Sequence, residues 1–168
     1  MKNIELKIIL SNPKTIIRKL RVAKARFAGK LDQVDTYYNS QKGRLKLREI
    51  NKKIFELIYY ERPDTKRSKI SNYKVVPIKR NFLTQIKNVL MKTFGKKVIV
   101  KKERNLWLHK NTRIHIDKVR DLGNYLELET VVKKGISSAK KEQQEIINLL
   151  GINEAKKIDV SYSDLLLK

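Results

Sequence analysis

Apolar and polar residues alternate along much of the chain, and a two-residue period is typical of a β-strand with one buried side. In the segment 3–8, Ile4, Leu6 and Ile8 face one side and polar residues face the other. The same alternation predicts further strands at 31–38, 44–50, 54–61, 70–77, 98–108, 112–119 and 125–132. Short polar turns separate several of these runs, so the sequence predicts antiparallel hairpins.

Other segments follow the spacing of an amphipathic helix. Helices are expected at 13–27, 82–94 and 138–150. Asn12 supplies a cap for the first helix, Pro13 suits its first turn, and a glycine follows the end of all three. The segment 160–165 is a short closing element that the pattern assigns neither to a helix nor to a strand.

The order of strand, helix and hairpins occurs twice, in two similar halves. About eight antiparallel strands in such an order favour an α+β fold: a closed eight-stranded β-barrel with the helices packed outside. A length of 168 residues is enough for one hydrophobic core and too short for two ordinary domains. We therefore expect a single domain over residues 1–168.

Composition excludes several kinds of chemistry. The chain has no cysteine, which rules out disulfides, thiolate nucleophiles and cysteine-bound zinc or iron–sulfur clusters. A metal would have to be held by oxygen ligands or by the two histidines. No apolar run approaches the roughly 18 residues of a membrane span, and no signal-peptide pattern occurs. We therefore expect a soluble cytoplasmic protein without a membrane partner.

Charge is the strongest compositional signal. The chain has 40 Lys and Arg residues against 17 Asp and Glu, a formal net charge of +23. Such an excess predicts polyanionic partners, and charge alone does not choose among nucleic acid, an anionic membrane and a phosphorylated small molecule. The segment 65–102 has twelve basic and no acidic residues, but regularly spaced apolar residues indicate that it is folded. A general bias of the source genome toward lysine would also produce much of this excess of positive charge.

Charged residues fall on one side of the predicted strands and apolar residues on the other. The charged sides contain, strand by strand, Arg44, Lys46 and Arg48; Lys102 and Arg104; Arg113, His115 and Asp117; and Glu127 and Glu129. An ordinary sheet with one solvated face would also alternate. Here, however, basic triplets and acidic pairs are on different strands, which suggests a binding site. In addition, the three helices each have an apolar face, and the apolar sides of the strands are needed to cover these faces. The charged sides are then expected to face inward, where a polyphosphate and its metal would offset the cost of burying like charges.

Several motifs occur in order along the chain. They are Asn3-Ile4-Glu5-Leu6-Lys7, Gln33-Val34-Asp35-Thr36-Tyr37-Tyr38, Gly43-Arg44-Leu45-Lys46-Leu47-Arg48, Tyr59-Tyr60-Glu61-Arg62-Pro63, Lys102-x-Arg104, Arg113-Ile114-His115-Ile116-Asp117, Leu122-Gly123-Asn124-Tyr125-Leu126-Glu127-Leu128-Glu129 and Ser161-Tyr162-Ser163-Asp164-Leu165. Together they resemble, over essentially the whole chain, the CYTH superfamily of triphosphate tunnel metalloenzymes, which includes class IV adenylyl cyclases and thiamine triphosphatases. The details look most like the class IV adenylyl cyclase branch.

The resemblance implies an eight-stranded tunnel that grips a triphosphate. The implied phosphate-binding residues are Lys7, Arg44, Lys46, Arg48, Arg62, Lys102, Arg104, Arg113 and His115, although a structural role for the histidine stays open. The implied ligands of Mg²⁺ or Mn²⁺ are Glu5, Asp117, Glu127 and Glu129, and oxygen ligands suit both ions. Catalysis is expected from these four carboxylates together with Lys7, Lys46, Arg48, Lys102 and Arg104. Asn3 departs from the family motif, which has a glutamate there, so the number of metal ions is open.

Three functions remain open. The first is a class IV adenylyl cyclase-like reaction that converts ATP to cyclic AMP and pyrophosphate. The second is hydrolysis of inorganic, thiamine or nucleoside triphosphate, because the same grip on phosphate serves both reactions. The third is non-catalytic binding of polyphosphate or RNA, which the surplus positive charge favours. The expected partner is ATP or another triphosphate, with non-specific affinity for nucleic acid as a second option. A monomer or a homodimer is expected.

Overall fold

The computed structural model describes residues 3–61 and 72–168. Its strands are β1 (Asn3–Ile9), β2 (Arg26–Tyr38), β3 (Arg44–Ile50), β4 (Ile54–Glu61), β5 (Asn72–Ile78), β6 (Lys96–His109), β7 (Thr112–Val119) and β8 (Gly123–Val131). Its helices are α1 (Pro13–Val22), α2 (Leu83–Phe94), α3 (Ile136–Leu150) and α4 (Tyr162–Leu165), and a 3₁₀ turn, η1 (Arg80–Phe82), precedes α2. Each predicted strand and helix therefore has a counterpart in the structure.

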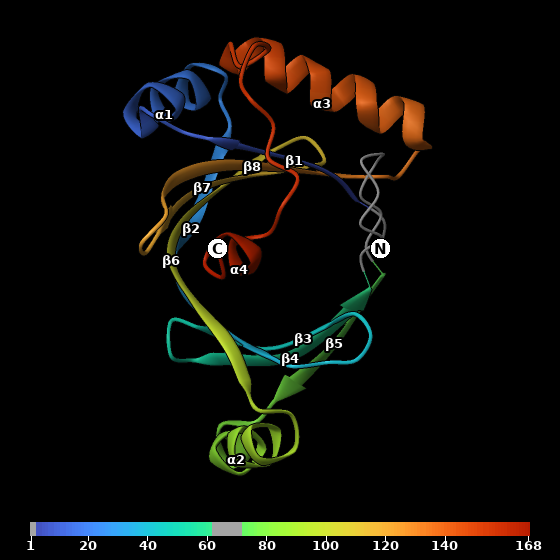
Figure 1. Ribbon diagram of the computed structural model, residues 1–168. Coiled ribbons are helices and arrows are strands. Elements are labelled where there is room, and N and C mark those ends of the chain that lie inside the picture. Colours follow the sequence, from blue (N-terminus) through green and yellow to red (C-terminus); the bar gives the residue numbers. More distant parts are fainter. Residues whose placement is uncertain (1–2, 62–71) are drawn as a thin grey trace.

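The eight strands form one antiparallel sheet in the order β1-β8-β7-β6-β2-β3-β4-β5. The sheet bends strongly, so that β1, β8 and β7 form one layer and β3, β4 and β5 the opposite layer, while β6 and β2 run between them (Figure 1). The α+β class and the eight antiparallel strands are confirmed. The expected closure of the barrel is not, because no backbone ladder joins the edge strands β1 and β5 in the part of the chain that the structure describes.

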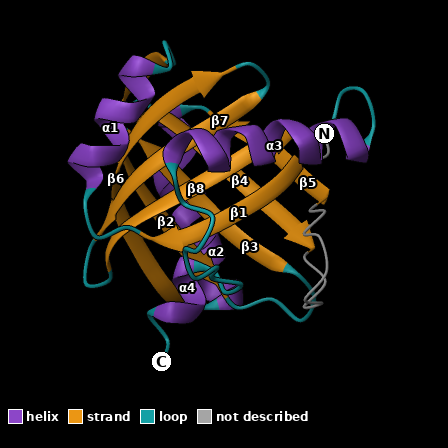
Figure 2. Cartoon of the chain, turned by 90° about the horizontal axis from the view of Figure 1, so that it is seen from above, coloured by secondary structure: helices purple, strands orange, loops and turns teal. Residues whose placement is uncertain are grey.

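Two helices cover the outer face of the layer that contains β1, β8 and β7. Figure 2 shows α3 lying across these strands, with α1 beside it. Ile16 and Leu20 of α1 and Ile146 and Leu150 of α3 are buried in one apolar cluster with Leu128 of β8. The apolar side of the strands thus faces the helices, and the charged side faces the interior, as the alternation predicts.

The opposite layer is covered by α2. Leu90 of this helix packs with Leu47 of β3 and Tyr38 of β2 in a second cluster. The helix ends at Gly95, which has a φ of 68°. A residue without a Cβ tolerates this conformation, so the predicted glycine stop is confirmed.

The first helix is shorter than the expected range of 13–27. It ends at Val22, and Lys24 turns the chain with a φ of 55°. Arg26 already belongs to β2, which pairs with β6 along its whole length. Phe27 packs there against Trp107, with ring centroids 5.0 Å apart and the ring planes tilted by 55°. This long-range pairing takes the residues before Gly29 into the sheet, and local spacing does not reveal it.

The element that the pattern left unassigned is α4. Ser161 and Asp164 form a capping box at its start, in which each side chain accepts a hydrogen bond from the other's backbone N–H. The short helix lies between the two layers of the sheet (Figure 1). No helix within residues 3–61 and 72–168 combines the length and apolarity that crossing a lipid bilayer requires.

Candidate active site

A cavity of about 510 Å³ lies on the inner face of the bent sheet. The predicted site residues that line it are Glu5, Lys7, Lys46, Arg48, Lys102, Arg104, Arg113, His115, Glu127 and Glu129. They come from β1, β3, β6, β7 and β8. The fold therefore brings residues from the start, middle and end of the chain around one space.

One wall of the cavity is a cluster of cations on β3 and β6 around a buried carboxylate of β2. Asp35 is 1% exposed, and it accepts hydrogen bonds from Arg48 Nε at 2.7 Å and Lys46 Nζ at 3.0 Å. Lys102 Nζ lies 3.8 Å from the same carboxylate. Asp35 is paired with Arg48 in the β2–β3 ladder, and Gln33 two residues earlier is paired with Lys102 across β2–β6. Strand register thus places three cations around one anion.

The pKa values of the groups in this cation wall depend on burial and on the excess of three cations over one carboxylate. Burial would raise the pKa of Asp35, but Lys46, Arg48 and Lys102 hold it well below its ordinary value. Burial, reinforced by Arg104, lowers the pKa of Lys102 to about 7. Asp35 attracts the Lys102 proton but is already shared by two other cations, so its pull does not offset burial. The wall has a surplus of cations that an added anion would compensate.

The facing wall contains the carboxylates. Glu127 and Glu129 of β8 and His115 of β7 place one ligand atom each within 4.8 Å of one another. His115 Nδ1 lies 3.5 Å from Glu127 Oε2 and 3.8 Å from Glu129 Oε1. Glu5 lines the same cavity and is the cross-strand partner of Glu129 in the β1–β8 ladder. Carboxylates of this kind are the ligands that hard divalent cations prefer, so these residues fit Mg²⁺ or Mn²⁺.

Cations of the protein neutralise this carboxylate wall. Arg104 lies 2.8 Å and Lys7 3.6 Å from Glu127, and Arg113 lies 2.8 Å from Glu129. Burial would raise the pKa of Glu127, but Lys7, His115 and Arg104 keep it well below its ordinary value. Glu127 is therefore ionised at neutral pH, in the state that binds a metal.

Asp117, a predicted metal ligand, has a different environment from the other carboxylates. It is 0% exposed and is not among the residues that line the cavity. Both of its oxygens accept hydrogen bonds from Arg104 at 2.7 Å, and Tyr162 Oη donates to Oδ2 at 3.0 Å. The two hydrogen bonds orient Arg104, which lines the cavity, whereas Asp117 is buried beneath the cavity lining.

One predicted phosphate ligand, Arg44, is not among the residues that line the cavity. Arg44 donates a hydrogen bond to Asp164 of α4 at 2.8 Å and lies 6.0 Å from the centre of the Tyr60 ring. It therefore ties α4 to β3. Arg62 lies outside the described residues.

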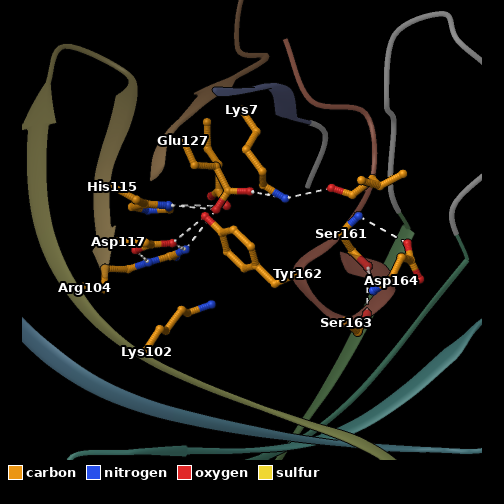
Figure 3. A network of polar contacts seen from close by, with 12 residues as sticks. Lys7, Lys102, Arg104, His115, Asp117, Glu127, Ser161, Tyr162, Ser163 and Asp164 are labelled. Atoms are coloured by element: carbon orange, nitrogen blue, oxygen red, sulfur yellow. Dashed lines mark hydrogen bonds and ion pairs between the residues drawn. The ribbon is translucent and has the colours of Figure 1, made fainter. Parts of the chain in front are cut away.

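Tyr162 belongs to the last of the sequence motifs, and it is a cavity-lining residue that the sequence did not predict. It projects from α4 into the charged cluster (Figure 3). Lys7 Nζ lies 4.2 Å and Lys102 Nζ 5.3 Å from the centre of its ring, within the range of cation–π attraction. Asp35 was missed in the same way, although its place between Gln33 and Tyr37 on the inward side of β2 was a usable signal. No local pattern identifies the position of Tyr162.

The structure resembles solved structures over nearly its full length. A Pyrococcus horikoshii protein, PH1012, has a TM-score of 0.83 with 23% identity, and the match covers 97% of this chain and 98% of that one. A candidate adenylate cyclase from Vibrio parahaemolyticus has a TM-score of 0.75 with 14% identity over 100% and 99% of the two chains. HpAC1 from Hippeastrum, a candidate adenylyl cyclase described as having a dominant triphosphatase activity, has a TM-score of 0.73 with 11% identity over 98% and 95%. The TM-scores establish a shared fold, and at identities this low they establish the fold alone.

Sequence comparison identifies the family. No curated protein sequence matches the chain. The CYTH domain profile, however, matches residues 1–162, which include every described residue that lines the cavity. The chain therefore belongs to the CYTH family.

Proposed function

We propose that the protein is a divalent-metal-dependent enzyme that binds a triphosphate in this cavity, with conversion of ATP to cyclic AMP and pyrophosphate as its reaction. The observation that carries the proposal is the charge of the cavity lining. Six Lys and Arg side chains and five Asp and Glu side chains line it, a surplus of at most one positive charge, since Lys102 has a pKa of about 7. ATP has about four negative charges at neutral pH. A divalent cation at the carboxylate wall therefore brings the site much closer to neutrality with ATP than the protein alone does.

The side chains of the two walls have different tasks in this proposal. Lys46, Arg48 and Lys102 are held toward the cavity by Asp35 and bind phosphate oxygens, with the Arg48 guanidinium suited to a bidentate contact. Arg104, fixed by Asp117, reaches the carboxylate wall from the other side. A metal bound by Glu5, Glu127 and Glu129 supplies Lewis-acid stabilisation of charge on phosphate oxygens. The cation wall stabilises charge that develops on the leaving pyrophosphate.

In the cyclase reaction, a bond forms between the ribose 3′ oxygen and the α-phosphorus. The bond from the α-phosphorus to the oxygen that bridges to the β-phosphorus breaks, and pyrophosphate leaves with that electron pair. The proton of the 3′ hydroxyl passes to solvent water in the same step. Ile58, Tyr60 and Val75 also line the cavity and offer apolar surface to the nucleoside. The resemblance of the motifs to the class IV branch supports the cyclase over other reactions.

Hydrolysis is the second candidate. HpAC1 shares the fold and is described as having a dominant triphosphatase activity. In this reaction water attacks the terminal phosphorus and gives its proton to solvent, the bond from that phosphorus to the bridging oxygen breaks, and the diphosphate leaves with the electron pair. The nucleoside part of the substrate needs no fixed position. The same two walls would serve it.

The products separate the two candidates. The purified full-length protein is incubated with ATP and Mn²⁺, and the nucleotides and phosphates are resolved by chromatography. Cyclic AMP with pyrophosphate supports the cyclase, whereas ADP with orthophosphate supports the hydrolase. Glu129→Gln is expected to abolish either activity. Glu103→Gln is the matched control, because Glu103 of β6 is exposed and pairs with Lys30.

Binding tests the charge argument directly. Inorganic triphosphate is titrated into the protein with and without Mn²⁺ in a calorimeter. Tight binding that needs Mn²⁺, with no product from any triphosphate, would contradict catalysis. Equal affinity with and without Mn²⁺ would contradict the role assigned to the carboxylate wall.

A further inference from the structure

We propose that His115 is a direct ligand of the divalent cation, together with Glu127 and Glu129, so that the metal site contains one nitrogen and is not made of carboxylates alone. The inference rests on the proposed metal-dependent function and deepens it. It departs from the four-carboxylate set that the motifs imply. The argument depends on where the imidazole and the two glutamates lie relative to one another.

The three side chains are held in place by the sheet. His115 of β7 is the cross-strand partner of Glu127 of β8 in the ladder between the two strands. Glu129 lies two residues further along β8, and therefore on the same inward face. Such positions on hydrogen-bonded strands vary less than positions on loops. The triangle of ligand atoms is therefore built into the sheet.

The distances within the triangle suit a cation better than a hydrogen bond. His115 Nδ1 lies 3.5 Å from one glutamate oxygen and 3.8 Å from the other. Good hydrogen bonds from nitrogen to oxygen are about 2.7–3.2 Å long, so neither contact is a strong one. Ligands about 2.1 Å from an ion and at right angles to each other are about 3 Å apart. To close the triangle around an ion, both glutamate side chains would rotate, and Glu127 Oε2 would exchange its 2.8 Å contact with Arg104 for the metal.

Burial limits what else the imidazole can do. His115 is 3% exposed, and its Nδ1 edge faces the two carboxylates and lines the cavity. Asp117, the carboxylate that the motifs imply instead, would have to give up hydrogen bonds from Arg104 and Tyr162 to reach a metal. His115 gives up only the two long contacts. His115 Nδ1 is therefore more accessible to a metal than Asp117 is.

A nitrogen ligand changes which ions the site prefers. Mg²⁺ is bound almost entirely by oxygen, whereas imidazole is a good ligand for first-row transition metals, in which affinity rises from Mn²⁺ through Co²⁺. We expect the site to prefer Mn²⁺ and Co²⁺ over Mg²⁺. Losing a partner of a metal ligand commonly lowers affinity by about 10- to 100-fold, and losing the ligand itself should cost at least as much.

Electron paramagnetic resonance with Mn²⁺ tests this without any turnover. The untagged protein is loaded with one equivalent of Mn²⁺, and spin-echo modulation from ¹⁴N is recorded. The chain has two histidines, and His109→Gln leaves His115 as the only imidazole. The expected result is strong ¹⁴N modulation in the wild type and in His109→Gln. Mn²⁺ affinity in His115→Gln should fall at least about tenfold while Mg²⁺ affinity changes less.

The outcomes separate this inference from the proposed function. Mn²⁺ binding without ¹⁴N modulation in His109→Gln would overturn the role of His115 and leave the metal-dependent enzyme in place. No Mn²⁺ binding at all, with or without inorganic triphosphate, would overturn both. Because the wild type and His109→Gln report on an intact His115, the test does not depend on whether His115→Gln folds.

Discussion

Lys102 is expected to make triphosphate binding depend on pH. Its amine is buried and lies near Arg104, and its pKa is about 7. A bound triphosphate brings negative charge close to the amine, which raises this pKa, so binding above pH 7 takes up a proton. The contribution of Lys102 to affinity is therefore complete below pH 7. It is lost as pH rises, until the pKa of the bound state is reached.

The size of the effect follows from the pKa of the free protein. With a pKa of about 7, the protonated fraction of Lys102 falls from roughly a quarter at pH 7.5 to roughly 1 in 300 at pH 9.5. If the bound amine stays protonated, the affinity for triphosphate falls about 75-fold over this range. About one proton is taken up for each ligand bound at pH 8.5.

Calorimetry measures both quantities. Inorganic triphosphate is titrated with Mn²⁺ at a series of pH values in buffers of different ionisation enthalpy, and the proton release of triphosphate and Mn²⁺ alone is measured in the same buffers and subtracted. Lys102→Arg is the informative variant, because a guanidinium keeps its proton and the profile should become nearly flat. Lys101→Arg is the matched control, since Lys101 is exposed on the other side of β6. A flat wild-type profile with no proton uptake would refute the reasoning.

Three changes in stability are also expected, each measured by urea unfolding. Asp35→Asn leaves the buried Lys46 and Lys102 and the half-buried Arg48 without their anion, and should lower the free energy of unfolding by about 3–5 kcal/mol. Tyr162→Phe removes the hydrogen bond to Asp117 and should cost about 1.5–3 kcal/mol. Gly43→Ala should cost at least about 1–3 kcal/mol, because φ is +66° and the new Cβ would lie 2.8 Å from the backbone oxygen of Tyr60.

Matched variants define what would contradict these expectations. Asp32→Asn changes an exposed carboxylate on the same strand as Asp35, and equal effects of the two would argue against the buried cluster. Tyr59→Phe removes an exposed hydrogen bond to Glu61, so a loss as large as that of Tyr162→Phe would be unexpected. Gly123→Ala shares a positive φ but has open space around the Cβ. An equal cost there would show that the clash at Gly43 contributes nothing.

Alternation in the sequence is enough to predict the inward charged rows. A strand has a period of two, so Lys46 and Arg48 must share a side, and Leu45 and Leu47 must take the other. Amphipathic helices need an apolar surface to cover, and this orients the rows toward the interior. Most of the strands and two of the three long helices were predicted nearly to their ends for this reason, whereas β2 begins at Arg26, five residues before the predicted start at 31. The first helix was predicted too long, because the pairing of β2 with β6 competes with the local helical pattern.

The sequence by itself determined which side chains point inward and which signs of charge each strand carries, because these depend only on neighbours along the chain. Tertiary structure decided which charges meet. Asp35 contacts cations of two other strands. Asp117 binds Arg104 and does not line the cavity. Tyr162 of α4 donates a hydrogen bond to Asp117, which lies 45 residues earlier in the chain. Whether a carboxylate binds a metal or an arginine is settled by strand register and by burial, and both arise only when distant segments pack together.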